Sequence, residues 1–375
     1  MTGHRLCRQV NYLAYLFAGS TGGNMGAQSI ESISEFLLHA GTNFQVIDMG
    51  RGLVPISAQT FLDIENAAIA VPRPRQEHAW FGVVFWSTQD QPAKEYIWFL
   101  KLPVDEQGLL VTASRNHFLQ IIVDALGNSL AQDTEQAEKL PDNPYNFVPP
   151  QSLMAHFNAM TKHLLNKPAV SGVKDVASYI RHPAVVDWQT LSLQAIADIA
   201  HQLEQEPLSQ ALTQHFDMYA EDFKQALLSA LDNTTLPAPL QQFLLERLEQ
   251  QWAQHHNKTV LLAMLRAVNT PKTAASVQAV LKLVLNSEHT DIDTLSVIAA
   301  RHFNQLDDAL LLAFFEKAAW LDAQQHYQGA LFQGFFADLV RLPDLRNRAL
   351  TLLRTPERSE TLATAIGALF SATRS

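Results

Sequence analysis

The sequence is poor in cysteine, in charged residues and in long apolar runs. One cysteine, Cys7, occurs among 375 residues, so the remainder of the chain has no thiol for disulfides, metal–thiolate sites or cysteine catalysis. No window approaches the roughly 18 uninterrupted apolar residues of a membrane-spanning helix, so we expect no membrane span. With 27 basic and 37 acidic side chains, the net charge is −10, which argues against binding by broad neutralisation of phosphates.

Signatures of established catalytic sites are also missing. The patterns G-x-S-x-G, H-E-x-x-H and G-x-G-x-x-G occur nowhere in the chain. The one glycine-dense stretch, "AGSTGGNMGAQS" at 18–29, lacks the lysine and hydroxyl that complete a phosphate-binding loop. We therefore expect no cofactor, and the sequence favours a protein that is not an enzyme.

The same stretch raises the question of where translation begins. Arg5 and Arg8 precede the apolar "VNYLAYLFA", as in a signal peptide, but this run is short and contains polar residues. The codons of "GGN" can form a purine-rich ribosome-binding site just upstream of Met25. We therefore favour Met25 as the natural start, residues 1–24 as a translated leader, and a cytoplasmic location. The alternative is a signal peptide over residues 1–20 and a periplasmic location.

The amino-terminal third alternates between helical and strand patterns. "SIESISEFLLHAG" predicts a helix, and "NFQVIDMGRGLVPIS" predicts a strand, a glycine turn and a second strand. "AQTFLDIENAA" is a short helix capped by Ser57, "AWFGVVFWS" and "EYIWFLKLP" form a hairpin, and "SRNHFLQIIVDALG" is a helix capped by Ser114 and closed by Gly127. We predict a small α+β domain over 29–128 and a polar, proline-rich linker over 129–150.

Residues 151–375 show helical periodicity only, and from Pro237 onward the helices start at a nearly fixed interval. First helices begin near Pro237, Pro271, Asp307 and Pro343, and second helices near Asn257, Asp291, Gln324 and Pro356. A spacing of about 32 to 36 residues is typical of stacked helical hairpins, and proline is well tolerated in the first turn of a helix. We predict an all-α helical-repeat domain of the HEAT or tetratricopeptide type, an α-solenoid, after the α+β domain.

Three segments resemble a known family. They are "FQVIDMGRGLVPIS", "IWFLKLPVDEQGLL" and "NHFLQIIVDALG". On these segments the chain resembles a bacterial family filed as domain of unknown function 3549, seen mainly in gammaproteobacteria. The resemblance runs from about Ser29 almost to the carboxyl end, which supports Met25 as the start because the leader lies outside it. It transfers no activity and no catalytic residues.

Two pairs of charged residues in the α+β domain are candidate ligand contacts. In "DMGRG", Asp48 and Arg51 lie across a glycine turn, where Arg51 could hold an anionic ligand. The alternative is that the pair only stabilises the turn. In "LPVDEQGLL", the adjacent Asp105 and Glu106 could supply acid–base groups or bind a divalent cation, although neighbouring side chains point in different directions and a solvated turn is the simpler interpretation.

The carboxyl-terminal part offers weaker candidates. Arg346 and Arg348 belong to an arginine-rich stretch between residues 341 and 358, which could dock nucleic acid or an acidic partner, or could be a solvated face. Asp198 and His201 lie at helical spacing, as in a metal site, but no matching ligand pattern repeats on another helix, so we expect no metal.

The functional hypothesis that follows is an adaptor or scaffold that binds another protein. Helical repeats bind through long surfaces and need none of the reactive groups that the sequence lacks. Two alternatives remain: an enzyme whose site, at the junction of the domains, includes Asp48, Arg51, Asp105 and Glu106, and an accessory protein that binds RNA through the carboxyl-terminal arginines.

Overall fold

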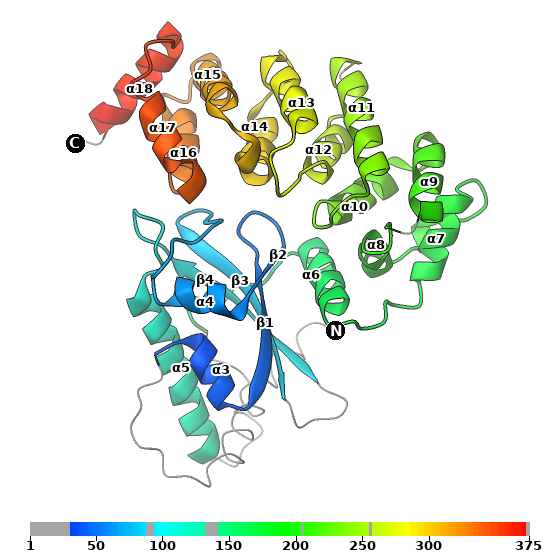
Figure 1. Ribbon diagram of the computed structural model, residues 1–375, viewed down its shortest axis with the longest axis vertical. Helices are drawn as coiled ribbons and strands as arrows, with labels where there is room; N and C mark the ends of the chain where they lie inside the picture. The colour runs from blue at the N-terminus through cyan, green and yellow to red at the C-terminus, as the bar shows by residue number, and fades with distance from the viewer. Residues whose placement is uncertain (1–30, 88–93, 132–141, 205, 255–256, 373–375) are drawn as a thin grey trace. The chain divides into compact units, whose positions relative to one another are not determined.

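A computed structural model describes residues 31–87, 94–131, 142–204, 206–254 and 257–372 (Figure 1). The expected leader and the proposed start at Met25 lie outside the described residues. The chain divides into two compact units, the first of residues 1–149 together with 341–343 and the second of residues 150–340 together with 344–375.

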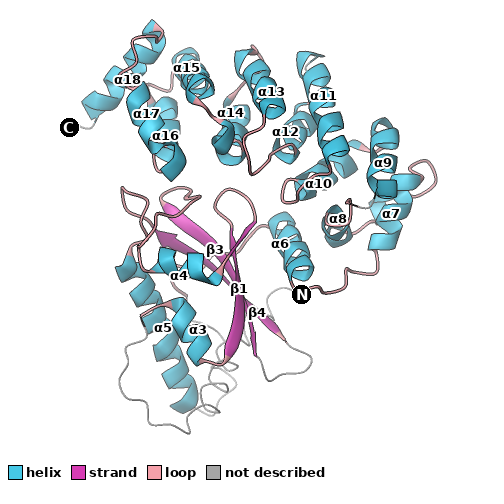
Figure 2. Cartoon of the chain, viewed as in Figure 1, coloured by secondary structure: helices cyan, strands magenta, loops and turns pink. Residues whose placement is uncertain are grey.

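In its described residues, the first unit combines a small sheet with three helices (Figure 2). The strands are antiparallel in the order β2-β1-β3-β4. This confirms the predicted strand–turn–strand and hairpin. In chain order the elements are α3 (Ile33–His39), β1 (Thr42–Asp48), β2 (Val54–Ile56), α4 (Ala58–Glu65), β3 (His78–Ser87), β4 (Glu95–Pro103) and α5 (Thr112–Ala131).

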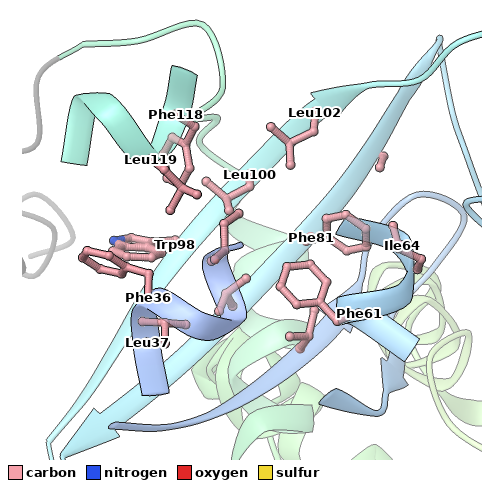
Figure 3. Close-up of a cluster of buried hydrophobic side chains, with 14 of the residues drawn as sticks. Phe36, Leu37, Phe61, Ile64, Phe81, Trp98, Leu100, Leu102, Phe118 and Leu119 are labelled. Carbon is pink, nitrogen blue, oxygen red and sulfur yellow. The ribbon is translucent and has the colours of Figure 1, made fainter. Parts of the chain in front are cut away.

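The core of this unit lies between one face of the sheet and the three helices (Figure 3). Alternate residues of a strand share a face, and on β3 and β4 this face carries Phe81, Phe85, Trp98 and Leu100. Phe61 of α4 meets Phe81 of β3 edge-on at 5.1 Å between ring centroids. Trp98 of β4 contacts Phe118 of α5 at 5.8 Å and Phe36 of α3 at 6.3 Å. Each helix therefore supplies an aromatic ring to the same buried layer.

In the first unit, the helix ends agree with the sequence signals except in α5. Ser57 caps α4 as predicted, because its hydroxyl accepts the N–H of Thr60 at 3.0 Å. Helix α5 begins ahead of Ser114, since the carbonyl of Val111 accepts the N–H of Ser114 at 3.0 Å. It also continues past Gly127, because a single glycine within a helix costs only about 1 kcal/mol and does not end it.

Part of the expected linker pairs with the sheet. The N–H of Lys101 donates to the carbonyl of Tyr145 at 2.7 Å, and the N–H of Phe147 donates to the carbonyl of Phe99 at 3.1 Å. The ring of Phe147 lies 4.8 Å from that of Trp80 and 5.7 Å from that of Phe99. The segment around Tyr145 thus covers the free edge of β4 and belongs to the first unit.

The described residues of the second unit form helices joined by loops, and none of these residues forms a strand. The chain as a whole is therefore an α+β protein with a helix-rich second part. In order, the helices are α6 (Gln151–Leu164), α7 (Val173–Arg181), η2 (Trp188–Thr190), α8 (Leu193–Ala200), α9 (Glu206–His215), η3 (Phe216–Met218), α10 (Glu221–Leu231), α11 (Ala238–Gln254), α12 (Lys258–Ala267), α13 (Ala275–Asn286), α14 (Ile292–Arg301), η4 (Phe303–Gln305), α15 (Asp308–Gln324), α16 (Ala330–Leu339), α17 (Pro343–Leu352) and α18 (Glu360–Ala372).

Many of these helices pack against the next but one along the chain. Helices α8, α10, α12 and α14 form one such series, and α9, α11, α13 and α15 form another. The final helix, α18, packs against both α15 and α16. Within the described part of the chain, no helix has both the length and the apolar character that a bilayer crossing requires.

The predicted helix starts are right at some prolines and wrong at others. Helix α17 begins at Pro343, whereas α13 begins four residues after Pro271, at Ala275. The reason is that Ala274 donates its N–H to the side chain of Gln305 at 2.9 Å, which holds the preceding segment outside the helix. Similarly, α18 begins after Ser359 and not at Pro356, because the Ser359 hydroxyl caps it. The start predicted near Gln324 is also wrong, since α15 extends that far and α16 follows at residue 330.

Candidate functional site

Asp48 and Arg51 are buried in the first unit and both contact one segment. Asp48 ends β1 with 1% exposure, and its Oδ1 accepts the N–H of Gly50 at 2.8 Å. Its Oδ2 lies 3.5 Å from Nη1 of Arg73, while Nε of Arg51 donates to the carbonyl of Pro74 at 3.0 Å. Burial raises the pKa of Asp48 to about 6, and the bond from Gly50 and the charge of Arg73 oppose that rise. The pair thus anchors the "DMGRG" loop to residues 73–74.

The "DMGRG" loop needs a glycine at position 50 because its backbone passes close to residue 73. A Cβ atom at this position would lie 1.9 Å from the carbonyl oxygen of Arg73. The neighbouring Met49 donates its N–H to the carbonyl of Trp80 at 2.8 Å. The backbone therefore approaches residue 73 at a distance that no other amino acid allows.

Asp105 and Glu106 lie in a separate, exposed turn. Oδ1 of Asp105 accepts the N–H groups of Gln107 at 2.8 Å and Leu109 at 2.9 Å. Gly108 follows with φ of +79°. This carboxylate is engaged by its own turn, so the structure brings Asp48 and Arg51 to one buried segment and leaves the acidic pair at the surface.

The polar residues around Asp198 also have internal partners. Nζ of Lys162 donates to Asp198 Oδ2 at 2.9 Å, and Gln194 donates to Oδ1 at 2.7 Å. The ring of His201 stacks on that of His163 at 5.0 Å. Burial, followed by the charge of His163, lowers the pKa of His201 to about 4. Among the described residues, no group of three or more His, Cys, Asp or Glu side chains is placed to hold a metal ion.

The candidate arginines lie on α17. Arg348 donates from Nη1 to the carbonyl of Leu306 at 3.1 Å, and its Nε lies 3.6 Å from Asp308. Arg346 is half-buried on the same helix. Beyond the helix, Arg358 donates to the carbonyl of Leu353 at 2.6 Å. Two of these guanidinium groups therefore bind backbone carbonyls of their own unit.

A groove in the second unit is the feature that the sequence reasoning missed. It has a volume of about 510 Å³ and is lined by α13, α15 and the beginning of α18. Helix α15 supplies a continuous stripe at helical spacing. The lining residues are Leu285, Asn286, Ala309, Leu312, Ala313, Glu316, Lys317, Trp320, Ser359 and Thr361.

The charged groups of the groove are held by neighbouring elements. Glu316 accepts the N–H of Ser359 at 2.8 Å and also the hydroxyl of Ser359. Nζ of Lys317 donates to the carbonyl of Ser287 at 2.9 Å and lies 4.9 Å above the ring of Trp320. Burial lowers the pKa of Lys317, and the charge of Glu288 opposes this shift.

Trp320 is the largest side chain that lines the groove, and 42% of it is exposed. A sequence signal for it exists, because Trp320 follows Ala309, Leu312, Ala313 and Glu316 on one face of a single helix. Periodicity alone cannot identify this face as the uncovered one, since that depends on where α13 and α18 pack.

The fold and the sites define an α+β protein whose second unit is rich in helices. Its buried charged residues have hydrogen-bond or ion-pair partners within their own unit. The chain belongs to the family described as "Protein of unknown function (DUF3549)", whose family model matches residues 28–370. This confirms the resemblance expected from the segments around Asp48, Asp105 and α5. No curated protein and no solved structure matches the chain.

Proposed function

We propose that this protein is a helical-repeat scaffold that binds another protein in the groove between α13, α15 and α18. The repeat architecture is supported by hydrogen bonds between residues one repeat apart. Lys162 contacts Asp198 across 36 residues, Asn269 contacts Asp232 across 37, and His302 contacts the carbonyl of Leu265 across 37. Such regular separations are typical of stacked helical pairs.

The observation that carries the proposed function is the exposure of Trp320 beside an apolar stripe. Monomeric proteins bury most large aromatic side chains, and tryptophan is enriched among the few residues that dominate binding energy at protein interfaces. Trp320 lies at the end of a row with Leu312 and Ala313, so a partner could bury all three side chains together.

The test is affinity capture with the full-length chain from cells of the source organism, followed by quantitative mass spectrometry. Trp320→Ala is compared with Met218→Ala, a substitution of another exposed apolar residue of the second unit, 58% exposed, that does not line the groove. We expect a saturable protein partner. Met218→Ala should capture as much of it as the unchanged chain, and Trp320→Ala should capture about tenfold less or lower still.

Two results would contradict the proposal. One is the absence of any saturable protein partner, and the other is equal capture by Trp320→Ala and the unchanged chain. A further experiment compares Arg348→Ala with the unchanged chain, each with and without nuclease treatment of the lysate. Capture that is lost with Arg348→Ala and with nuclease, and is unaffected by Trp320→Ala, would favour the RNA-binding alternative.

A further inference from the structure

We propose that acid releases helix α6 from the rest of the second unit through protonation of His156 and His201. The release is independent of the proposed function. Three features of the described residues support it: an amide group that donates to His156, a stack of two histidine rings between α6 and α8, and a small apolar contact between these helices.

His156 lies on α6 with 7% exposure, and its Nδ1 faces a donor. Nδ2 of Asn233, which follows α10, lies 3.5 Å from this nitrogen. The same Nδ2 donates to the carbonyl of Ser229 at 3.4 Å, and Oδ1 of Asn233 accepts from Nη2 of Arg301 at 3.5 Å. Because a guanidinium group only donates, this contact fixes the orientation of the amide. Nδ1 of His156 is therefore an acceptor and carries no proton.

Protonation of His156 would place two N–H groups against each other at this contact. The new charge would also face the guanidinium of Arg301, which already binds the carboxylate of Asp232 at 2.7 Å. Burial, followed by the charge of Arg301, lowers the pKa of His156 to about 4. A solvated imidazole titrates near pH 6.5. Between these two values, acid favours a state in which His156 is exposed to water.

His201 supplies a second ring of the same kind. It follows α8, and its ring stacks on that of His163, in the last turn of α6, with 24° between the planes. The pKa of His201 is lowered by burial and by the charges of His163 and His156 on α6, and Asp198 opposes this shift. Asp198 itself is bound by Lys162 of α6 at 2.9 Å. A charge on His201 therefore meets more cations than carboxylates.

The apolar contact between α6 and α8 is small. Ala155 and Ala159 of α6 meet Ala197 of α8, and Leu193 packs beside them. Each methyl group removes little apolar area from water, so the polar contacts contribute much of the attachment. Helix α6 is also the first helix of the second unit, and terminal elements open most readily because they have fewer neighbours. It can therefore open while later helices stay folded.

The release should be steep in pH. A histidine whose pKa is 6.5 in the open state and about 4 in the closed state makes opening about eightfold more favourable at pH 5.5 than at pH 7. Two such residues give roughly 60-fold. Opening would uncover Ala197 and Leu193, so acid would expose an apolar surface of α8 that α6 covers at neutral pH.

The first experiment measures hydrogen exchange in the full-length chain at pH 7 and pH 5.5. Dividing each rate by the intrinsic rate at the same pH gives the opening constant of each helix. We expect the opening constant of α6 to rise roughly 60-fold, and that of α15, which lacks histidine, to change by less than about threefold. A rise of less than tenfold in α6, or a rise in α15 as large as that in α6, overturns the inference.

The second experiment changes the contact at Nδ1 of His156. Asn233→Asp replaces the donor with a carboxylate, which can accept from a protonated imidazole. His156→Asn keeps an acceptor oxygen close to the position of Nδ1 and does not titrate. In both variants the rise for α6 should fall from roughly 60-fold to about eightfold, because one histidine remains. His182→Gln, at an exposed position after α7, is the control and should leave the rise within about twofold of that in the unchanged chain.

Each protein in this comparison is its own reference. A substitution that merely weakens the packing of α6 raises its opening constant at both pH values and leaves their ratio unchanged. A ratio that stays near 60-fold in both Asn233→Asp and His156→Asn overturns the role of His156. If a variant does not fold, the comparison of α6 with α15 in the unchanged chain still tests the release.

Discussion

Glu65 and Ser34 are joined by two hydrogen bonds that hold the end of α4 against the beginning of α3. Ser34 donates its N–H at 3.1 Å and its hydroxyl at 2.5 Å to the same carboxylate oxygen, and the N–H of Ile33 donates to the other oxygen at 2.6 Å. The carboxylate thus satisfies N–H groups that have no partner within α3. Burial raises the pKa of Glu65, and the hydroxyl of Ser34 is the largest opposing influence.

Replacing Glu65 by glutamine should destabilise the first unit. An amide presents one oxygen and one N–H₂ group, so either Ile33 or Ser34 would face a donor in place of an acceptor. We expect a loss of about 1–3 kcal/mol in the free energy of unfolding and faster hydrogen exchange in α3. Glu106→Gln, in the exposed turn, is the control and should change stability by less than about 0.5 kcal/mol. Equal effects of the two substitutions would show that Glu65 does not hold α3.

Gly50→Ala should be poorly tolerated. The added Cβ would lie 1.9 Å from the carbonyl oxygen of Arg73, so the "DMGRG" loop must move away from the segment that Arg51 and Asp48 bind. We expect a loss of at least roughly 1–3 kcal/mol in urea unfolding. Gly334→Ala in α16 is the opposite case, since open space surrounds its Cβ, and should be neutral or stabilise by up to about 1 kcal/mol. A stable Gly50→Ala variant would contradict the close approach.

The sequence predicts much of the first unit because its signals are local. Alternation of apolar residues identified β1, runs of aromatic and β-branched residues identified β3 and β4, and Ser57 identified the start of α4. The pairing of the segment around Tyr145 with β4 is a long-range contact, and nothing in its polar, proline-rich composition indicates it. Likewise, Pro271 is compatible with a helix start, but Gln305 binds the backbone after it and delays α13.

The candidate sites were predicted less well than the elements. Asp48 and Arg51 are adjacent in the loop as expected, yet both contact a segment more than 20 residues away, which no local pattern specifies. The groove depends on the placement of α18 beside α15, and this packing arises from tertiary contacts such as that between Ser359 and Glu316. Helical periodicity predicts the stripe on α15 but not whether a neighbour covers it.

Buried histidines should make the second unit less stable in acid. Burial lowers the pKa of His156, His201 and His302 to about 4 from a usual value of 6.5. Between pH 6.5 and 4 the unfolded chain therefore binds protons that the folded chain does not. The stability is complete above about pH 6.5 and falls as the pH decreases toward 4, by up to about 1.4 kcal/mol per pH unit for each histidine.

A variant at His302 isolates this effect. Nε2 of His302 is 2.7 Å from the carbonyl of Leu265, and glutamine can donate a similar bond without titrating. When the pH falls from 7 to 5, the free energy of unfolding of His302→Gln should decrease by about 2 kcal/mol less than that of the unchanged chain. The measurement is the free energy of unfolding from hydrogen exchange in α12 and α14 at both pH values. His182→Gln, at an exposed position after α7, is the control, and an identical pH dependence of all three proteins would contradict the prediction.

The ion pair of Asp232 and Arg301 should stabilise the packing of helices α10, α12 and α14 in the second unit. Nε of Arg301 donates to Asp232 Oδ1 at 2.7 Å, and Asn269 donates to the same atom at 3.0 Å. Asp232 follows α10, Arg301 ends α14, and Asn269 follows α12. Burial raises the pKa of Asp232, and the charge of Arg301 is the largest opposing influence.

Arg301→Met would leave the carboxylate of Asp232 buried without its cation, which should cost about 3–5 kcal/mol in the free energy of unfolding. Adding Asp232→Asn removes the uncompensated charge, so the double variant should be more stable than Arg301→Met alone. Arg247→Met breaks the exposed pair with Asp217 and should cost less than about 1 kcal/mol. If Arg301→Met costs no more than Arg247→Met, or if Asp232→Asn gives no rescue, the pair does not hold these helices together. Rescue would show that the uncompensated carboxylate of Asp232, and not the lost packing of Arg301, causes most of the destabilisation.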